Sequence, residues 1–102
     1  MTIVSKPTII YYTEKYPNAT TALLSWHKDF SQMTFNNFNE LKSVYVHASI
    51  VGNNRVIFNI KGNTFRLIAA MDFKRKAAYI IWFGTHSEYD KIDAETVRYI
   101  EI

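Results

Sequence analysis

Hydrophobic and polar side chains alternate along the chain between residues 55 and 61. Val56, Phe58 and Ile60 lie on one side of this pattern, and Arg55, Ile57, Asn59 and Lys61 lie on the other. Alternation with a period of two indicates a strand with one buried face. Gly62 and Asn63 follow, and both residue types tolerate positive φ, so they predict a tight hairpin turn.

A second strand is predicted after this turn, over residues 64–73. A two-residue loop would place Asn59 opposite Arg66 and Lys61 opposite Thr64. The large apolar side chains of both strands then share one face, which is the agreement between register and pattern that a hairpin requires. The opposite face carries the polar set Arg55, Asn59, Lys61 and Arg66.

The third predicted strand, residues 78–85, is apolar on both sides, which is typical of a strand inside a sheet. A four-residue loop at 74–77 would turn Tyr79, Ile81, Phe83 and Thr85 toward the polar face. A loop one residue shorter or longer, with a bulge, would reverse this facing. The sequence pattern leaves both facings open.

The first half of the chain predicts helices rather than strands. Asn37, followed three residues later by Glu40, resembles a capping box. The expected elements are a short strand at 2–5, a helix at 7–16, a helix from 19 or 20 to 33, a short helix within 35–45, a loop or lead-in at 47–54, and a helical turn or tail at 93–102.

This order predicts a single α+β domain over residues 1–102, with two N-terminal helices on one face of a small, mostly antiparallel sheet. The order of elements is β-α-α-short α-β-β-β. No helix is left for the other sheet face, so we expect that face to meet solvent or a partner.

Composition narrows the possible classes. The chain has 102 residues and no cysteine, which excludes disulfides and thiolate zinc sites and fits a reducing compartment. The N-terminus lacks the apolar run of a signal peptide, and no segment has the length of a membrane span. Three widely separated histidines without an H-E-x-x-H motif argue against a metal hydrolase. We therefore expect a cytoplasmic protein without a membrane partner.

The net charge of +3 is small, but the cations cluster in the predicted sheet. Lys74, Arg75 and Lys76 form a run at a hairpin tip, and Arg55, Lys61 and Arg66 share the polar face. A cationic face suggests a polyanion such as nucleic acid. The alternative is that these are ordinary solvated hairpin tips.

Three motifs resemble the HigB-type toxins of bacterial type II toxin–antitoxin systems, which belong to the RelE-like fold group. They are G-N-x-x-R-L-I at 62–68, D-F at 72–73 and H-x-E-Y-D-K at 86–91. The Tyr16-Pro17 and Phe58-Asn59 pairs also fit, and the resemblance spans essentially the whole chain. It implies an mRNA endoribonuclease that acts on translated messages at the ribosome, without a cofactor. It also implies a HigA-type antitoxin with a helix-turn-helix domain, bound in a hetero-oligomeric complex.

Within this resemblance, metal-independent cleavage would use the adjacent 2′-OH as nucleophile. The reaction needs an acid, a base and fixed positive charge at the phosphate. His86 is the expected acid or base, Arg66 the expected phosphate ligand, and Tyr89, one helical turn after His86, the expected stacking group or acid. Arg55, Lys61 and Lys91 are expected to bind the substrate charge or to transfer protons. Lys74, Arg75 and Lys76 are expected to contact messenger or ribosomal backbone.

Each assignment has a structural alternative. Arg66 could pair with Asp72 or Glu88, His86 could cap the end of its strand, and Tyr89 could belong to the core. The segment Tyr79–Thr85 carries no Arg or Lys, whereas many RelE-like relatives place a cation there. Two other classes therefore stay open: a non-catalytic RNA- or ribosome-binding module, and a protein-interaction domain with an apolar patch on the third strand.

Overall fold

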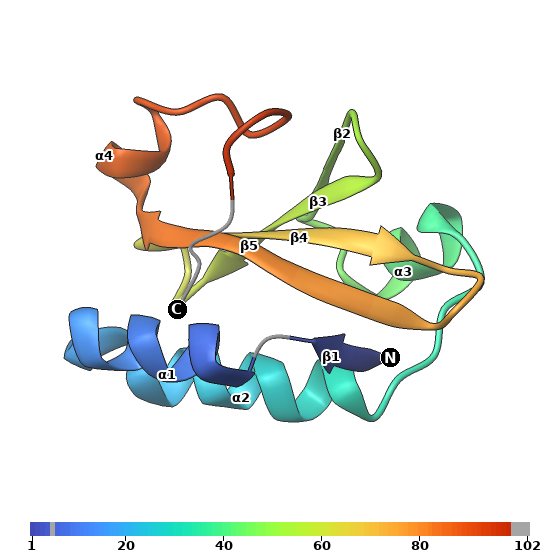
Figure 1. Ribbon diagram of the computed structural model, residues 1–102, viewed down its shortest axis with the longest axis horizontal. Helices are drawn as coiled ribbons and strands as arrows, with labels where there is room; N and C mark the ends of the chain where they lie inside the picture. Colours follow the sequence, from blue (N-terminus) through green and yellow to red (C-terminus); the bar gives the residue numbers. More distant parts are fainter. Residues whose placement is uncertain (5, 99–102) are drawn as a thin grey trace.

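The computed structural model describes residues 1–4 and 6–98, and it consists of one five-stranded sheet with the two long N-terminal helices against one face (Figure 1). The α+β class and the relative order of the predicted elements are confirmed. Two elements were not predicted: residues 49–51, expected as a loop or lead-in, form an edge strand, and residues 86–89 form a short helix. No helix in the described residues is long and apolar enough to cross a membrane. The elements are β1 (Thr2–Val4), α1 (Lys6–Lys15), the 3-10 turn η1 (Pro17–Ala19), α2 (Thr20–Ser31), α3 (Phe38–Val44), β2 (Ser49–Val51), β3 (Arg55–Ile60), β4 (Phe65–Asp72), β5 (Ala77–Thr85) and α4 (His86–Tyr89).

The strands lie in the order β1-β5-β4-β3-β2, with β1 parallel to β5 and the other pairs antiparallel. Asn59 pairs with Arg66, so the predicted register of the first hairpin is confirmed. The loop is longer than the predicted two residues, because β3 ends at Ile60 and β4 begins at Phe65. Positive φ occurs at Lys61 and Gly62 rather than at Gly62 and Asn63.

A bulge in β5 decides the facing that the sequence left open. Ile68 pairs with Trp82 while Ala69 pairs with Ile80, so Ile81 is an extra residue between them. Before the bulge, Tyr79 and Ile81 face away from the helices; after it, Phe83 turns into the core beneath α1. Neither predicted facing holds for the whole strand, because a bulge within a strand reverses the alternation from that point onward.

The main core lies between the sheet and helices α1 and α2 (Figure 1). Helix α2 buries Leu23, Trp26 and Phe30, whose spacing places them on one helical face. Phe30 and Trp26 pack on Phe58 of β3 with ring centroids 5.4 and 5.2 Å apart. Large aromatic side chains therefore fix how the helices sit on the sheet.

The predicted cap of the short helix is confirmed in part. The Asn37 side chain accepts a hydrogen bond of 2.9 Å from the backbone N–H of Glu40. The Glu40 carboxylate bonds to the backbone N–H of Asn36 rather than to that of Asn37. The cap is therefore one-sided, with the reciprocal bond displaced by one residue.

The expectation that the second sheet face meets solvent or a partner is wrong for its centre. Residues after β5 fold back over this face, where Ile57, Ile68 and Ile81 form a second buried cluster. Side chains from the returning segment pack on that cluster, namely Tyr89, Ile92, Ala94 and Val97. The segment 90–98 carries no long helical pattern, so only its packing reveals this role. Residues 99–102 of the predicted tail lie outside the described residues.

Candidate functional site

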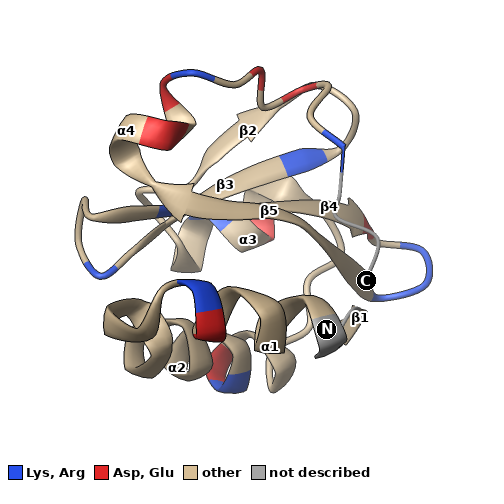
Figure 2. Ribbon diagram, turned by 60° about the vertical axis from the view of Figure 1, so that its left-hand side comes forward, with Lys and Arg blue, Asp and Glu red and all other residues tan. Residues whose placement is uncertain are grey.

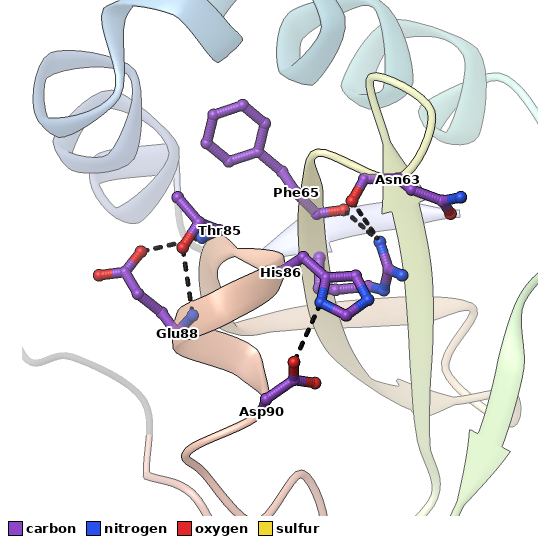
Figure 3. Close-up of polar contacts among 7 residues, drawn as sticks. Asn63, Phe65, Thr85, His86, Glu88 and Asp90 are labelled. Carbon is purple, nitrogen blue, oxygen red and sulfur yellow. Dashed lines mark hydrogen bonds and ion pairs between the residues drawn. The ribbon is translucent and has the colours of Figure 1, made fainter.

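The turn between β5 and α4 places His86 at one end of the sheet. Thr85 is the N-cap of α4, and its hydroxyl accepts a hydrogen bond of 3.2 Å from the backbone N–H of Glu88. The Glu88 carboxylate in return accepts a bond of 2.9 Å from the backbone N–H of Thr85 (Figure 3). This capping box makes Thr85, not His86, the capping residue, and it leaves the His86 side chain available.

His86 is held by its backbone and by its ring. The backbone N–H of His86 donates a hydrogen bond of 3.0 Å to the Thr64 carbonyl, which connects α4 to the β3–β4 loop. Its Nδ1 lies 3.2 Å from Oδ2 of Asp90 (Figure 3), and the two side chains are 48% and 61% exposed. An exposed pair of this kind adds little stability. It does orient the imidazole, so that Nε2 is left for another proton donor or acceptor.

Arg66 lies on β4 and pairs directly with Gly84 of β5. Gly84 precedes His86 by two residues. Nη1 of Arg66 donates to the carbonyls of Asn63 and Phe65, each at 3.2 Å. A guanidinium has five N–H donors in a planar fork, so these contacts leave donors for an anion. The alternative ion pairs of Arg66 are not formed: within residues 1–4 and 6–98, Asp72 pairs with Arg75 and Glu88 bonds to Tyr16.

Glu88 also connects the site to the N-terminal helices. The Tyr16 hydroxyl donates a hydrogen bond of 2.7 Å to Oε1 of Glu88. The hydrogen bond from the Thr85 backbone, followed by that from Tyr16, lowers the pKa of Glu88. Burial and the Glu88 carboxylate together raise the pKa of Tyr16. The sequence placed Tyr16 at the end of the first predicted helix and within the resemblance, but it did not predict this bond, because the contact joins residues from the two ends of the chain.

Tyr89 completes the turn that begins at His86. It is half-buried on the second cluster, with its ring centroid 6.2 Å from that of Trp82. Burial raises the pKa of Tyr89, and the positive charge of Arg66 opposes that change in part. The phenol is therefore protonated at neutral pH and lies within the electrostatic influence of Arg66. Tyr89 contributes to the packing of this face as well as to the candidate site.

The candidate cations divide between two ends of the sheet. Figure 2 shows Lys and Arg on both hairpin loops, which lie at opposite ends. Lys61 is in the loop next to His86, where its Nζ donates to the Asn18 carbonyl at 3.1 Å. Lys91 follows α4 and is exposed. The structure therefore places both of these lysines on the elements that carry the candidate site.

The remaining cations are not gathered around His86. Lys74, Arg75 and Lys76 follow β4, whose eight residues separate them from Arg66's end of the sheet by about 23 Å. Lys76 also donates to the carbonyl of Phe35 and the side chain of Asn36. Arg55 donates to the carbonyls of Ala94 and Val97 at 2.9 and 2.7 Å, so it holds the C-terminal segment in place.

Comparison with known proteins gives a consistent result. Residues 19–92 match the HigB_toxin family, described as the RelE-like toxic component of a toxin-antitoxin system. A protein named mRNA interferase HigB from Escherichia coli O6:H1 is 28% identical over 94 residues, covering 90% of this chain and 91% of that protein. The mRNA interferase toxin HigB of Escherichia coli strain K12 is 27% identical over 92 residues, covering 88% of each chain. An mRNA interferase HigB from Shigella flexneri matches to the same extent.

Proposed function

Because the chain belongs to the HigB_toxin family of RelE-like toxic components of toxin–antitoxin systems, we propose that it is a single-domain, cytoplasmic endoribonuclease that cleaves messenger RNA on the translating ribosome. The observation that carries the proposal is that an exposed, oriented histidine and an arginine are both attached to the same hairpin loop. His86 and Arg66 both bond to the β3–β4 loop, through Thr64 and Asn63 respectively.

The proposed reaction is a metal-independent transesterification that releases the downstream fragment with a 5′-hydroxyl and leaves a cyclic phosphate on the upstream fragment. The 2′-oxygen attacks the adjacent phosphorus, the bond from phosphorus to the 5′-oxygen breaks, and a cyclic phosphate and a 5′-hydroxyl form. One proton leaves the 2′-OH and one reaches the 5′-oxygen. His86 is the proposed proton-transfer group, and Asp90 orients its ring at 3.2 Å.

Arg66 is proposed to hold the scissile phosphate, since its fork-shaped donor set matches two phosphate oxygens. Tyr89 is proposed as a protonated hydrogen-bond donor at the same site, because burial raises its pKa. Lys61 and Lys91 are proposed to contact the neighbouring RNA backbone. Arg55 is assigned a structural part instead, because both of its carbonyl contacts lie in the C-terminal segment.

The basic loop at Lys74–Lys76 is proposed to contact ribosomal or messenger backbone away from the cut. Its distance from the candidate site follows from the length of β4. Neutralising Lys74 and Arg75 together is expected to weaken ribosome association and reduce its salt dependence, with the chemistry at His86 unaffected.

As a toxic component the chain has an antitoxin partner. We propose a HigA-type antitoxin with a helix-turn-helix domain, bound in a hetero-oligomer.

The test of this function is growth arrest after induced expression in a bacterium. We expect wild type to arrest growth and His86→Ala to relieve the arrest, because loss of an acid–base group costs about 10²–10⁴-fold in rate. The matched control is His27→Ala, a half-buried histidine on α2 away from the site. Soluble levels measured by immunoblot, with circular dichroism of purified protein, separate inactivity from misfolding.

Cleavage sites mapped on messages bound to purified ribosomes give the second measurement. Arg66→Ala is expected to lower cleavage by about 10²–10³-fold, and Arg66→Lys to recover only part of it, because lysine lacks the planar fork. Arg98→Ala, an exposed arginine, is the control. If folded wild type neither arrests growth nor cuts ribosome-bound RNA, the enzymatic function is wrong and a non-catalytic RNA-binding module takes its place.

A further inference from the structure

A pocket of about 470 Å³ opens on the side of β3 that lies away from β4. Strand β2 pairs only with Arg55–Ile57, so it leaves the edge of β3 uncovered from Phe58 onward. The pocket occupies this free edge. Residues 44–48 form one wall, and Phe58, Asn59, Gly62 and Asn63 form the other.

The walls combine rigid aromatic surface with a few polar groups. Tyr45 packs edge-on against Phe58 at 5.1 Å and also contacts Phe30 at 5.7 Å, so its ring is fixed by the core. Val44 and Val46 line the pocket and are 53% and 59% exposed, so they add accessible apolar surface to it. A small pocket with apolar walls and a few convergent polar groups is typical of a ligand site.

The polar groups of the pocket are the kind that recognise nucleobases. Asn59, Asn63 and His47 are exposed and line it. A side-chain amide offers a donor and an acceptor together, which matches the edge of a base, and an imidazole can stack on its face. The amides of Asn59 and Asn63 carry no charge with which to select a charged peptide side chain.

Its place beside Arg66 favours RNA over other ligands. Asn59 is the direct cross-strand partner of Arg66, and the Asn63 carbonyl accepts a hydrogen bond from the Arg66 guanidinium. The pocket wall therefore begins about one strand spacing, 4.8 Å, from the proposed phosphate ligand. Lys42 and Lys61 flank the opening, since Lys42 donates to the carbonyl of Val46 and Lys61 precedes Gly62. Cations at the rim suit the phosphates on either side of a bound base.

We propose that this pocket binds the base of the nucleotide next to the phosphate held by Arg66, with Asn59 and Asn63 reading the base edge. The inference rests on the proposed ribonuclease function, which it extends from a cleavage site to a base-selecting subsite. The pocket then sets which nucleotide is preferred beside the cut, while His86 and Arg66 perform the chemistry.

The first test is nuclear magnetic resonance of the full chain titrated with the four nucleoside 5′-monophosphates and, separately, with ribose 5-phosphate. We expect the side-chain amide signals of Asn59 and Asn63 to shift with the nucleotides, most strongly with one base, and to stay in place with ribose 5-phosphate. Equal shifts with ribose 5-phosphate would mean that only phosphate binds. Unmoved amide signals with all four nucleotides would also overturn the base subsite.

The second test compares Asn59→Ala with Asn39→Ala, an exposed asparagine on α3 that does not line the pocket. Loss of one hydrogen-bonding amide is expected to weaken binding of the preferred nucleotide by about 3- to 10-fold. On ribosome-bound messages it should raise KM and relax the base preference beside the cut, with kcat nearly unchanged. Asn39→Ala should do neither.

These outcomes separate the pocket from the function on which it rests. Nucleotide binding at the pocket without RNA cleavage by wild type would remove the ribonuclease function and leave the base site in place. Cleavage by Asn59→Ala with wild-type KM and base preference would remove the base site and leave the ribonuclease. If Asn59→Ala instead weakens antitoxin binding and leaves nucleotide binding intact, the pocket is a protein interface and the proposal is wrong.

Discussion

The Tyr16 hydroxyl donates a hydrogen bond of 2.7 Å to Oε1 of Glu88 and so connects the end of α1 to the turn that carries His86. The Tyr16 ring is itself fixed, because it packs edge-on against Phe65 at 5.6 Å and Phe83 at 5.7 Å. The same Glu88 oxygen accepts the Thr85 N–H at the start of α4. The helical layer therefore constrains the candidate site on the far side of β5.

Tyr16→Phe is predicted to loosen α4 without altering the core packing of the ring. Loss of a hydrogen bond to a charged acceptor is expected to cost about 1–3 kcal/mol in the free energy of unfolding. Cleavage should fall as well, by up to about 10²-fold, since small displacements of a reacting group are costly. Urea unfolding and single-turnover cleavage measure both effects. Tyr11→Phe makes the same chemical change on α1 and should leave both quantities nearly unchanged; an equal effect of the two variants would contradict the prediction.

Stability is predicted to fall in acid partly through Glu88. Its pKa is lowered in the folded protein by the bonds from Thr85 and Tyr16. A carboxylate with a lowered folded pKa stabilises the protein above its unfolded pKa, and that contribution is lost as the pH falls through the folded pKa. Glu88→Gln should therefore reduce the loss of unfolding free energy below about pH 4. The measurement is urea unfolding at a series of pH values, and parallel curves for the two proteins would exclude Glu88 as a cause.

Asp90→Asn is predicted to affect activity more than stability. The pair with His86 is largely exposed, so its removal should change the unfolding free energy by less than about 0.5 kcal/mol. An asparagine can present its amide N–H to the imidazole and favour the wrong tautomer, so we expect cleavage to fall by about 10-fold or more. Single-turnover rates against pH provide the measurement. Wild-type rates across the whole pH range would show that Asp90 does not orient His86.

Gly84→Ala is predicted to disturb the site by displacing Trp82. A Cβ at this position would lie 2.6 Å from Cη2 and 2.7 Å from Cζ2 of Trp82, and 3.1 Å from Oε1 of Glu88. We expect a loss of about 1–3 kcal/mol, as for other overpacked sites, together with a changed tryptophan fluorescence spectrum.

Gly62→Ala is the control for this substitution. Its φ is +62° and its Cβ would meet nothing within 4 Å, so it should cost about 1 kcal/mol through backbone strain and leave the spectrum unchanged. If Gly84→Ala keeps both the stability and the spectrum of wild type, the indole is not confined by this glycine.

Arg55→Ala is predicted to release the C-terminal segment from the sheet. The side chain donates to the carbonyls of Ala94 and Val97, and hydrogen bonds from a charged donor contribute about 1.5–3 kcal/mol. Hydrogen exchange at residues 92–97 should become faster, with smaller changes in β3 and β4. Lys28→Ala, an exposed cation on α2, controls for the loss of charge. Unchanged exchange at residues 92–97 would mean that the apolar contacts alone hold the segment.

The first hairpin shows how much of the fold local pattern can decide. Asn59 pairs with Arg66 as the alternation predicts, because a slip by one residue would turn every apolar side chain to the wrong face. Helix α2 and the Asn37 cap were predictable for a similar reason, since their signals lie within one or two helical turns. The motif at 86–91 likewise marked His86 and Tyr89 as a local pair on one turn, and their catalytic roles stay a prediction.

Three features depend on contacts that no local pattern encodes. The bulge at Ile81 lies where β5 both pairs with β4 and packs against the helices, so the facing of Phe83 follows from tertiary packing. The sequence indicates a free cation at Arg55, whereas its guanidinium donates to the Val97 carbonyl of the C-terminal segment. Lys74–Lys76 and Arg66 looked like one basic face, but the length of β4 separates them.

The alternation of side chains thus determined strands β3 and β4, their mutual register and the face that they bury, because only one register places their apolar side chains on the same side. Only the tertiary structure determined that the second face is closed by residues 90–98 and that Glu88 bonds to Tyr16. Those contacts join segments far apart in the chain. Their free energy exists only after the sheet and helices have brought the partners together, so no stretch of sequence carries it alone.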